Sequence, residues 1–206
     1  RDGPGGRCLC RTTCGRVIAA MIVFCHLLND NSGSPVVLRE VIAALNGRGY
    51  STKLFVGSQG RGVLEYAGAP IQRYWYRRSR FRILTLVTFL ASQWSLYRAL
   101  SRSALPPDAI IYVNTLLPFG AALWARSNGH AVLYHVHEVS LSPRALQNFL
   151  VHIVQKTARW VIYVSEENRR MLPIADVPSV VVPNSIPDRI ANKGFGSDYS
   201  PRRSGL

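Results

Sequence analysis

Two histidines and a glutamate lie within the segment YHVHEVS, residues 134–140. His135 and His137 stand two positions apart, so in a β-strand both would point to one face while Glu138 points to the other. Such a set could bind a metal, but no third ligand stands nearby, and a metal site is not favoured. A histidine that hydrogen-bonds a substrate is the preferred interpretation, and a core histidine bonded to the backbone is the alternative.

A polar turn that contains glycine, NDNSGSP at 29–35, follows an apolar stretch and precedes an amphipathic segment. Ser34 is the expected helix cap, and Pro35 is the expected first helical residue. Gly33 would let a ligand approach the backbone closely, and the N–H groups at the start of the helix suit a phosphate or sugar hydroxyls. The alternative is a polar loop with an ordinary helix cap. A dinucleotide site is disfavoured, because the turn lacks the G-x-G-x-x-G pattern.

Positive charge is concentrated in one part of the chain. The 206 residues include 25 Lys and Arg against 11 Asp and Glu, a formal net charge of +14, which indicates an anionic partner such as nucleic acid, acidic lipid or a phosphorylated ligand. No acidic residue lies between Tyr66 and Pro107, where arginines and aromatic residues are interleaved. The residues that we expect to contact an anionic membrane are Arg73, Trp75, Arg77, Arg78, Arg80 and Arg82. A solvated basic face is the alternative.

Short β-branched and aromatic runs alternate with longer segments of helical period. This alternation predicts an α/β fold with an open, mostly parallel, Rossmann-like sheet and helices on both faces. The predicted strands are 22–26, 53–56, 71–76, 109–114, 131–137, 160–164 and 179–182, and the predicted helices lie near 35–46, 62–67, 81–101, 118–127, 143–158 and 166–172. The apolar segment 81–100 is interrupted by polar residues and flanked by arginines, so it predicts a crossover helix packed on the sheet rather than a membrane span.

The two ends of the chain differ in composition from the part between them. Residues 1–20 are rich in Gly and Arg without a hydrophobic period, which predicts a flexible extension, and residues 191–206 predict a disordered tail or the start of a linker. The folded domain is expected over residues 21–190. The four cysteines show neither zinc-site spacing nor an even disulfide pattern, so a reduced, cytosolic compartment is expected.

Four segments resemble, in this order, the amino-terminal domain of retaining glycosyltransferases of family GT4, which have the two-domain GT-B fold. They are SGSP at 32–35, HVHE at 135–138, VIYVSEENRRML at 161–172 and VVVPNSI at 180–186. The resemblance implies that the turn lies near the donor phosphates and the reacting sugar, and that His137 contacts the transferring sugar as the catalytic residue. The residues expected to bind substrate or donor are Asn31, Ser32, Gly33, Ser34, Glu138 and Asn184. The family usually has Asn-Gly where Asn184 is followed by Ser185 here, a mild departure.

The resembled reaction moves a hexose from a nucleotide sugar, expected to be a UDP- or GDP-sugar, to a hydroxyl of a glycan or lipid-linked acceptor. It proceeds with retention at the anomeric carbon and with no metal or other cofactor. The family's second domain, which binds the nucleotide diphosphate and supplies the E-x7-E carboxylates, would begin just after VPNSIPD, and we expect it to be absent from this sequence. We therefore expect an incomplete fragment with negligible transfer on its own. The resemblance also implies a cytoplasmic protein that is peripheral on the inner face of an anionic membrane.

Two other interpretations stay open. A basic nucleic-acid-binding module would fit the net charge, although no zinc-finger, RRM or helix-turn-helix pattern is present and nucleic acid is not favoured. A sugar epimerase or a phosphorylase of GT-B fold would share this architecture, and only the second domain would distinguish it.

Overall fold

The computed structural model describes residues 21–58 and 60–184. These residues form one sheet of seven parallel strands in the order β3-β2-β1-β4-β5-β6-β7. The strands are β1 (Ile22–His26), β2 (Thr52–Gly57), β3 (Ile71–Tyr74), β4 (Ile110–Asn114), β5 (Ala131–Val136), β6 (Trp160–Tyr163) and β7 (Ser179–Val181). The predicted Rossmann-like α/β fold is confirmed.

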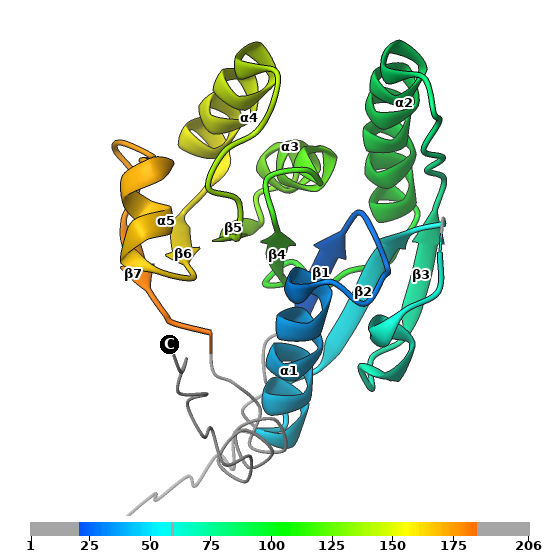
Figure 1. Ribbon diagram of the computed structural model, residues 1–206. Helices are drawn as coiled ribbons and strands as arrows, with labels where there is room; N and C mark the ends of the chain where they lie inside the picture. The colour runs from blue at the N-terminus through cyan, green and yellow to red at the C-terminus, as the bar shows by residue number, and fades with distance from the viewer. Residues whose placement is uncertain (1–20, 59, 185–206) are drawn as a thin grey trace, which may run out of the picture.

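Helices cover both faces of this sheet. The α-helices are α1 (Gly33–Gly47), α2 (Arg82–Ser101), α3 (Phe119–Ser127), α4 (Arg144–Thr157) and α5 (Glu166–Met171), and a 3-10 helix, η1, spans Val63–Tyr66. In Figure 1, α2, α3 and α4 lie on one side of the strands and α1 lies on the other.

The core is divided between these two faces. Every residue of β1 is buried, as expected for a parallel strand covered on both sides. Val23 and Cys25 pack in the cluster that contains the buried residues of α2, α3 and α4, whereas Phe24 packs with Leu38 of α1. This alternation follows from the period of two along a strand.

Helices α2 and α3 are in close contact near the carboxyl edge of the sheet. Gly120 donates its N–H to Gln93 Oε1 at 3.1 Å. A Cβ at residue 120 would lie 2.4 Å from the Gln93 carbonyl oxygen, so only glycine fits at this contact. The rings of Phe89 and Phe119 also meet, with centroids 5.8 Å apart.

The first half of α2 has no buried side chain. The buried residues of this helix begin at Phe89, and none lies in 82–88. The prediction of a helix packed on the sheet is therefore right for the second half and wrong for the first. The physical reason is length, because α2 has 20 residues whereas β3 beside it has only 4. Within the described part of the chain, no helix is long and apolar enough to cross a membrane.

Other predicted boundaries shift by one or two residues. β3 ends at Tyr74 rather than at Tyr76. Helix α1 begins at Gly33 with Ser32 as its N-cap residue, so the prediction of Ser34 as the cap is wrong. Pro35 is tolerated inside the first turn because the N–H groups of that turn have no intrahelical partner. The predicted extension 1–20 and tail 191–206 lie outside the described residues.

Candidate active site

The direction of winding reverses between β1 and β4. From β1 the chain moves outward through β2 to β3, and from β4 it moves outward on the other side through β5 and β6 to β7. At such a switch point, the loops that follow the two central strands diverge and leave a crevice at the carboxyl edge of the sheet. His26 is the last residue of β1 and Asn114 is the last residue of β4, so both lie at this edge.

Asn114 joins the loops that follow β1, β4 and β5. Its Oδ1 accepts a hydrogen bond from His137 Nε2 at 3.0 Å. Its Nδ2 lies 3.1 Å from His26 Nδ1 and donates to the Ser34 carbonyl oxygen at 3.4 Å. The start of α1 and His137, which are about 100 residues apart in the sequence, therefore lie on one rim of the sheet.

The bond to Asn114 fixes the tautomer of His137. Because the amide oxygen can only accept, the imidazole proton is on Nε2, and Nδ1 carries a lone pair. Burial, reinforced by the neighbouring His135 and His26, lowers the pKa of His137 to about 3. The ring is therefore neutral near pH 7 and can accept a hydrogen bond from a hydroxyl. With so low a pKa it is a poor carrier of protons at neutral pH.

His135 lies directly beside His137, with ring centroids 4.2 Å apart. Its Nδ1 is 2.7 Å from the hydroxyl of Tyr112. Burial raises the pKa of Tyr112 and lowers the pKa of His135 to about 4, so a neutral phenol and a neutral imidazole share this hydrogen bond. The buried Nε2 of His135 has no partner among the described residues. Over residues 21–58 and 60–184, no group of three or more His, Cys, Asp or Glu side chains could hold a metal ion.

Glu138 is bonded to backbone N–H groups. Its Oε1 accepts from Leu116 at 3.0 Å, and its Oε2 accepts from its own neighbour His137 at 3.2 Å. Burial raises the pKa of this carboxyl, although the backbone hydrogen bonds oppose the shift. Asn168 of α5 donates to the Glu138 carbonyl oxygen. These bonds hold the loop after β5 against the loop after β4 and so position His137, while contact of Glu138 with substrate stays a prediction.

The turn that precedes α1 is held in place by η1. Asn29 is buried, its Nδ2 donates to Glu65 Oε1 at 2.8 Å, and its Oδ1 accepts from the Leu64 N–H at 3.2 Å. Gly62 passes so close that a Cβ there would lie 2.5 Å from the Asp30 carbonyl oxygen. The turn therefore has a fixed position relative to the sheet.

The serine that could cap α1 is bonded to Asp30 instead. Ser32 donates its hydroxyl at 2.5 Å and its N–H at 2.9 Å to Asp30 Oδ1, and it makes no side-chain bond to the helix. Burial would raise the pKa of Asp30, but the two hydrogen bonds from Ser32 lower it overall. The first turn of α1 thus has no side-chain cap, and a carboxylate that is charged at neutral pH stands next to it.

The residues around Gly33 are open to solvent. Asn31, Ser32 and Gly33 are exposed, and Ser34 is half-buried. A Cβ added at Gly33 would meet no atom within 4 Å. No contact within the described chain therefore requires glycine at the start of α1.

Sequence reasoning missed His26, Asn114 and Thr115. Thr115 has φ of 72°, a left-handed conformation that β-branched residues rarely adopt, and its N–H donates to the His135 carbonyl oxygen at 2.8 Å. Strained backbone of this kind concentrates at functional sites. For Asn114 the sequence did contain a signal, because this polar residue ends the otherwise apolar strand IIYVN at the edge where ligands bind.

The sequence profile of the glycosyl transferase 4-like domain matches residues 32–185. The chain belongs to this family. Comparison of the sequence with curated proteins finds no match. The matched region contains the start of α1, Asn114 and His137, so the residues that meet at the switch point all lie within the family domain.

Solved structures show that this glycosyl transferase 4-like domain has the fold of GT-B glycosyltransferases. Anabaena HepE, in complex with UDP and glucose, has a TM-score of 0.57 and 17% identity, over 85% of this chain and 50% of that one. MurG of Acinetobacter baumannii has a TM-score of 0.55 and 14% identity, over 80% and 45%. Sucrose-phosphate synthase from Thermosynechococcus elongatus has a TM-score of 0.53 and 15% identity, over 84% and 95%. The chain thus spans about half the length of HepE and MurG.

The remaining predicted site residues lie away from the switch point of the family domain. Asn184 is exposed and follows β7, which β5 and β6 separate from β4. Arg73 of β3 forms an ion pair with Glu65, so its charge is compensated. Trp75 is exposed in the loop after β3. The other predicted membrane-contact residues, all exposed, are Arg77, Arg78, Arg80 and Arg82.

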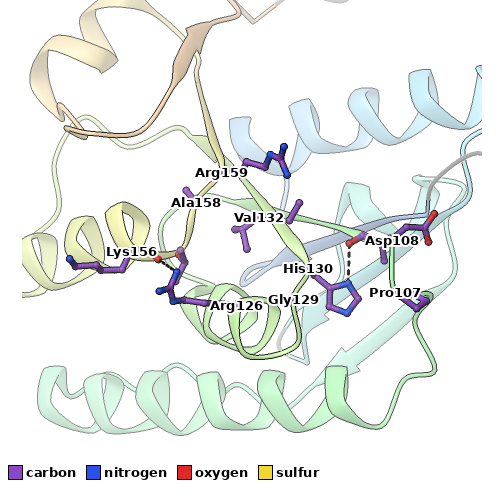
Figure 2. Close-up of a pocket in the computed structure, with 12 residues that line it drawn as sticks. Pro107, Asp108, Arg126, Gly129, His130, Val132, Lys156, Ala158 and Arg159 are labelled. Carbon is purple, nitrogen blue, oxygen red and sulfur yellow. Dashed lines mark hydrogen bonds between the residues drawn. The ribbon is translucent and has the colours of Figure 1, made fainter.

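The opposite, amino-terminal edge of the sheet carries a hollow that Figure 2 shows. It has a volume of about 390 Å³ and is lined by residues that include Arg126, His130 and Lys156. Arg126 donates to the Lys156 carbonyl oxygen at 2.7 Å, near the end of α4. A basic side chain that caps a helix end explains part of this positive charge without a ligand. None of the predicted site residues lines the hollow.

Proposed function

We propose that this domain forms one wall of the cleft of a glycosyltransferase that moves a hexose from a UDP- or GDP-sugar to an acceptor hydroxyl, with retention at the anomeric carbon. The observation that carries the proposal is the junction at Asn114, where the start of α1 and His137 meet at the switch point of a family domain. Open α/β sheets bind their ligands at this crevice.

His137 would bind the transferring sugar through Nδ1. The tautomer leaves this nitrogen as an acceptor, and a sugar hydroxyl is a matching donor. Because the ring stays neutral at pH 7, it would orient the hydroxyl rather than remove its proton. Asn114 would act as a positioning residue, since it holds the ring that contacts the sugar.

The turn before α1 would contribute to the sugar side of the cleft. The open N–H groups of the helix start could bind an oxygen of either a sugar or a phosphate. The charged Asp30 carboxylate, which is held by Ser32, repels a phosphate but accepts hydrogen bonds from sugar hydroxyls. We therefore place the hexose at this turn and the diphosphate farther away.

The nucleotide part of the donor would be bound by residues outside this domain. The family and the HepE structures, which contain UDP, UDP-glucose, or UDP with glucose, support a nucleotide-sugar donor. Because the chain spans about half of HepE, we propose that the 206-residue chain alone has negligible transfer activity. The proposed acceptor is a glycan or a lipid-linked molecule, the proposed location is the cytoplasmic face of the membrane, and no cofactor is proposed.

A transfer assay with a panel of UDP- and GDP-hexoses tests the proposal, using a protein that joins this domain to a nucleotide-binding second domain. Gly33→Ala is the sharpest variant, because the added Cβ meets no atom of the chain. Gly47→Ala, at the other end of α1, is the matched control and also meets no atom. We expect Gly33→Ala to lower kcat/KM about tenfold or more and Gly47→Ala to leave it within about twofold. Equal effects of the two variants, or full activity of His137→Ala, would contradict the proposal.

A further inference from the structure

The sheet has an open edge at β3. This strand is first in the order of the sheet and pairs only with β2, as Figure 1 shows. The Pro70 and Tyr74 carbonyl oxygens accept N–H groups from residues in and just after β2, at 2.9 and 2.8 Å. In a strand, the N–H and C=O of one residue point to the same side, and the side alternates from residue to residue. The backbone groups of Ile71 and Arg73 therefore point away from β2, to the open edge.

Helix α2 covers only one end of this edge. The N–H of Trp75, just after β3, donates to Ser95 Oγ at 3.0 Å. Ser103, just after α2, donates to the side chain of Gln72 in β3 at 3.0 Å. The helix therefore runs antiparallel to β3 and beside it. Between these two contacts, the outward N–H groups of β3 have no hydrogen-bond partner among the described residues.

A basic hollow lies between the edge of β3 and α2. It has a volume of about 420 Å³, and its lining includes Gln72 of β3 and Trp94, Arg98 and Arg102 on the helix side. Both of these arginines are exposed, and neither forms an ion pair within the described part of the chain. The Arg98 guanidinium lies over the Trp94 ring, 4.5 Å from its centroid, which holds its charge at the hollow. No acidic residue lies between residues 66 and 107 to offset this charge.

The spacing of the two arginines matches that of alternate side chains on a strand. Arg98 and Arg102 are four positions apart in the sequence, which corresponds to about 6 Å along a helix axis. Side chains on one face of a strand are two positions apart, or about 6.6 Å along the strand. Because α2 runs beside β3, a strand added to the edge would bring alternate side chains next to both arginines. Carboxylates at those positions would pair with them.

The open backbone and the charge together indicate one kind of occupant. Lipid headgroups or nucleic acid would pair with the arginines but would leave the N–H groups of the edge without a partner. A second copy of the chain could pair through its own β3, but the arginines of both copies would then meet, which like-charge repulsion disfavours. An extended acidic peptide matches both features, because its backbone pairs with the edge and its carboxylates pair with the arginines.

We propose that the edge of β3 and the hollow beside it bind an extended, acidic segment of a partner protein as an additional strand of the sheet. The segment has Asp or Glu at every second position, facing Arg98 and Arg102. Because β2 separates β3 from the switch point between β1 and β4, the segment lies outside the proposed sugar site. The interaction is therefore independent of the proposed function.

Fluorescence anisotropy of the 206-residue chain with a labelled peptide of alternating Glu and Val residues tests this interaction. The comparison peptide has the same sequence with methylated backbone nitrogens, so it keeps the charge but cannot donate hydrogen bonds. We expect the first peptide to bind and the methylated peptide to bind about tenfold or more weakly. The bound peptide should also slow the hydrogen exchange of the Ile71 and Arg73 amides.

A pair of arginine variants tests the role of the hollow. Arg98→Gln with Arg102→Gln should weaken binding of the Glu–Val peptide about tenfold at low salt, because two ion pairs are lost. The matched control is Arg144→Gln with Arg159→Gln, two exposed arginines at the ends of α4, which β2, β1 and β4 separate from β3. The control loses the same charge and should bind as the unchanged chain does.

Two variants at residue 73 test the role of the edge backbone. Arg73→Pro and Arg73→Ala both remove the side chain and its ion pair with Glu65, but only proline also removes the outward N–H. Proline is tolerated at an edge position whose N–H is not used by the sheet. We expect Arg73→Pro to bind the peptide about fivefold more weakly than Arg73→Ala, since one hydrogen bond is lost. Circular dichroism verifies that all the variants fold.

Each other outcome overturns the added strand. Absence of peptide binding, equal binding of the methylated peptide, or equal binding by Arg73→Pro and Arg73→Ala would show that the edge pairs with no segment. Equal binding by the two double arginine variants would remove the role of the hollow. Tighter binding to phosphatidylglycerol vesicles or to RNA than to the peptide, lost with Arg98 and Arg102, would assign these arginines to lipid or nucleic acid. Dimers seen by sedimentation and lost in Arg73→Pro would assign the edge to a second copy.

Discussion

The carboxyl edge of the sheet carries two regions of opposite chemistry. Around Asn114, polar side chains are buried, and most of their donors and acceptors are bonded within the domain. At the α2 tip, residues 81–88, the apolar side chains are exposed. Buried polar groups are stable only when they are paired, and clustered apolar groups are stable in water only when something covers them. The first region is therefore organised by its own chain, whereas the described part of the chain leaves the apolar side chains of the second uncovered.

Acid should have the largest effect on the polar region, because three buried histidines there are held neutral. Burial lowers the pKa of His26 and His135 to about 4 and that of His137 to about 3, against about 6.5 in an unfolded chain. When the folded pKa lies below the unfolded one, stability is complete above the unfolded value and is lost as the pH falls towards the folded value. We expect the free energy of unfolding, from urea titrations, to drop by on the order of 5 kcal/mol between about pH 7 and pH 4.

The control for acid sensitivity is His152→Gln, at an exposed position of α4. This variant should leave the pH dependence of the free energy of unfolding unchanged. His137→Gln should make the drop in that free energy between about pH 7 and pH 4 smaller. Glu138 has the opposite effect on stability, because its raised pKa means that the folded protein binds a proton at this carboxyl at a higher pH than the unfolded chain does. Acid therefore stabilises the folded protein through this group. A stability that is flat from neutral pH to pH 4 would show that the histidines are not held neutral.

Asn114→Ala should have the next largest effect. It removes the hydrogen-bond partner of His137, the contact with His26 and the donor to the Ser34 carbonyl in one step. We expect a loss of about 3 kcal/mol in the free energy of unfolding, measured with urea at neutral pH. Asn148→Ala, at an exposed position of α4, should change it by less than about 0.5 kcal/mol. Equal losses for the two variants would mean that Asn114 does not hold the loops together.

The smallest effect is expected at the α2 tip. Ile83→Ser with Val87→Ser should change the free energy of unfolding by less than about 1 kcal/mol, because neither side chain is packed in the domain and only helix propensity is altered. The measurement is the same urea titration in the absence of lipid. A loss of about 3 kcal/mol, equal to that of Asn114→Ala, would mean that the tip packs within the protein in solution and would remove the contrast.

The strands and the fold class are predictable because parallel strands covered on both faces must be nearly continuous apolar runs. The junction at Asn114 is not, since it depends on the register that pairs Cys25 of β1 with Val113 of β4, and no local pattern encodes that register. The exposure of the α2 tip is also not predictable from the sequence, because α2 carries apolar residues on its buried and on its exposed face, and its period cannot show where β3 ends. Ser32 and Ser34 are equally good caps by type, and only the backbone distinguishes them, because Ser32 is extended and the helix begins at Gly33.

The most direct test of a sugar site at the junction is the side-chain nitrogen spectrum of His137, recorded on the chain with and without UDP-hexoses, GDP-hexoses and the free hexoses. We predict a neutral ring at pH 7 with its proton on Nε2, and an Nδ1 resonance that moves when a sugar hydroxyl donates to it, while exposed His152 does not respond. A protonated ring, a proton on Nδ1, or an Nδ1 resonance that no sugar moves would contradict the claim that the start of α1 and His137 form one wall of a sugar-binding cleft.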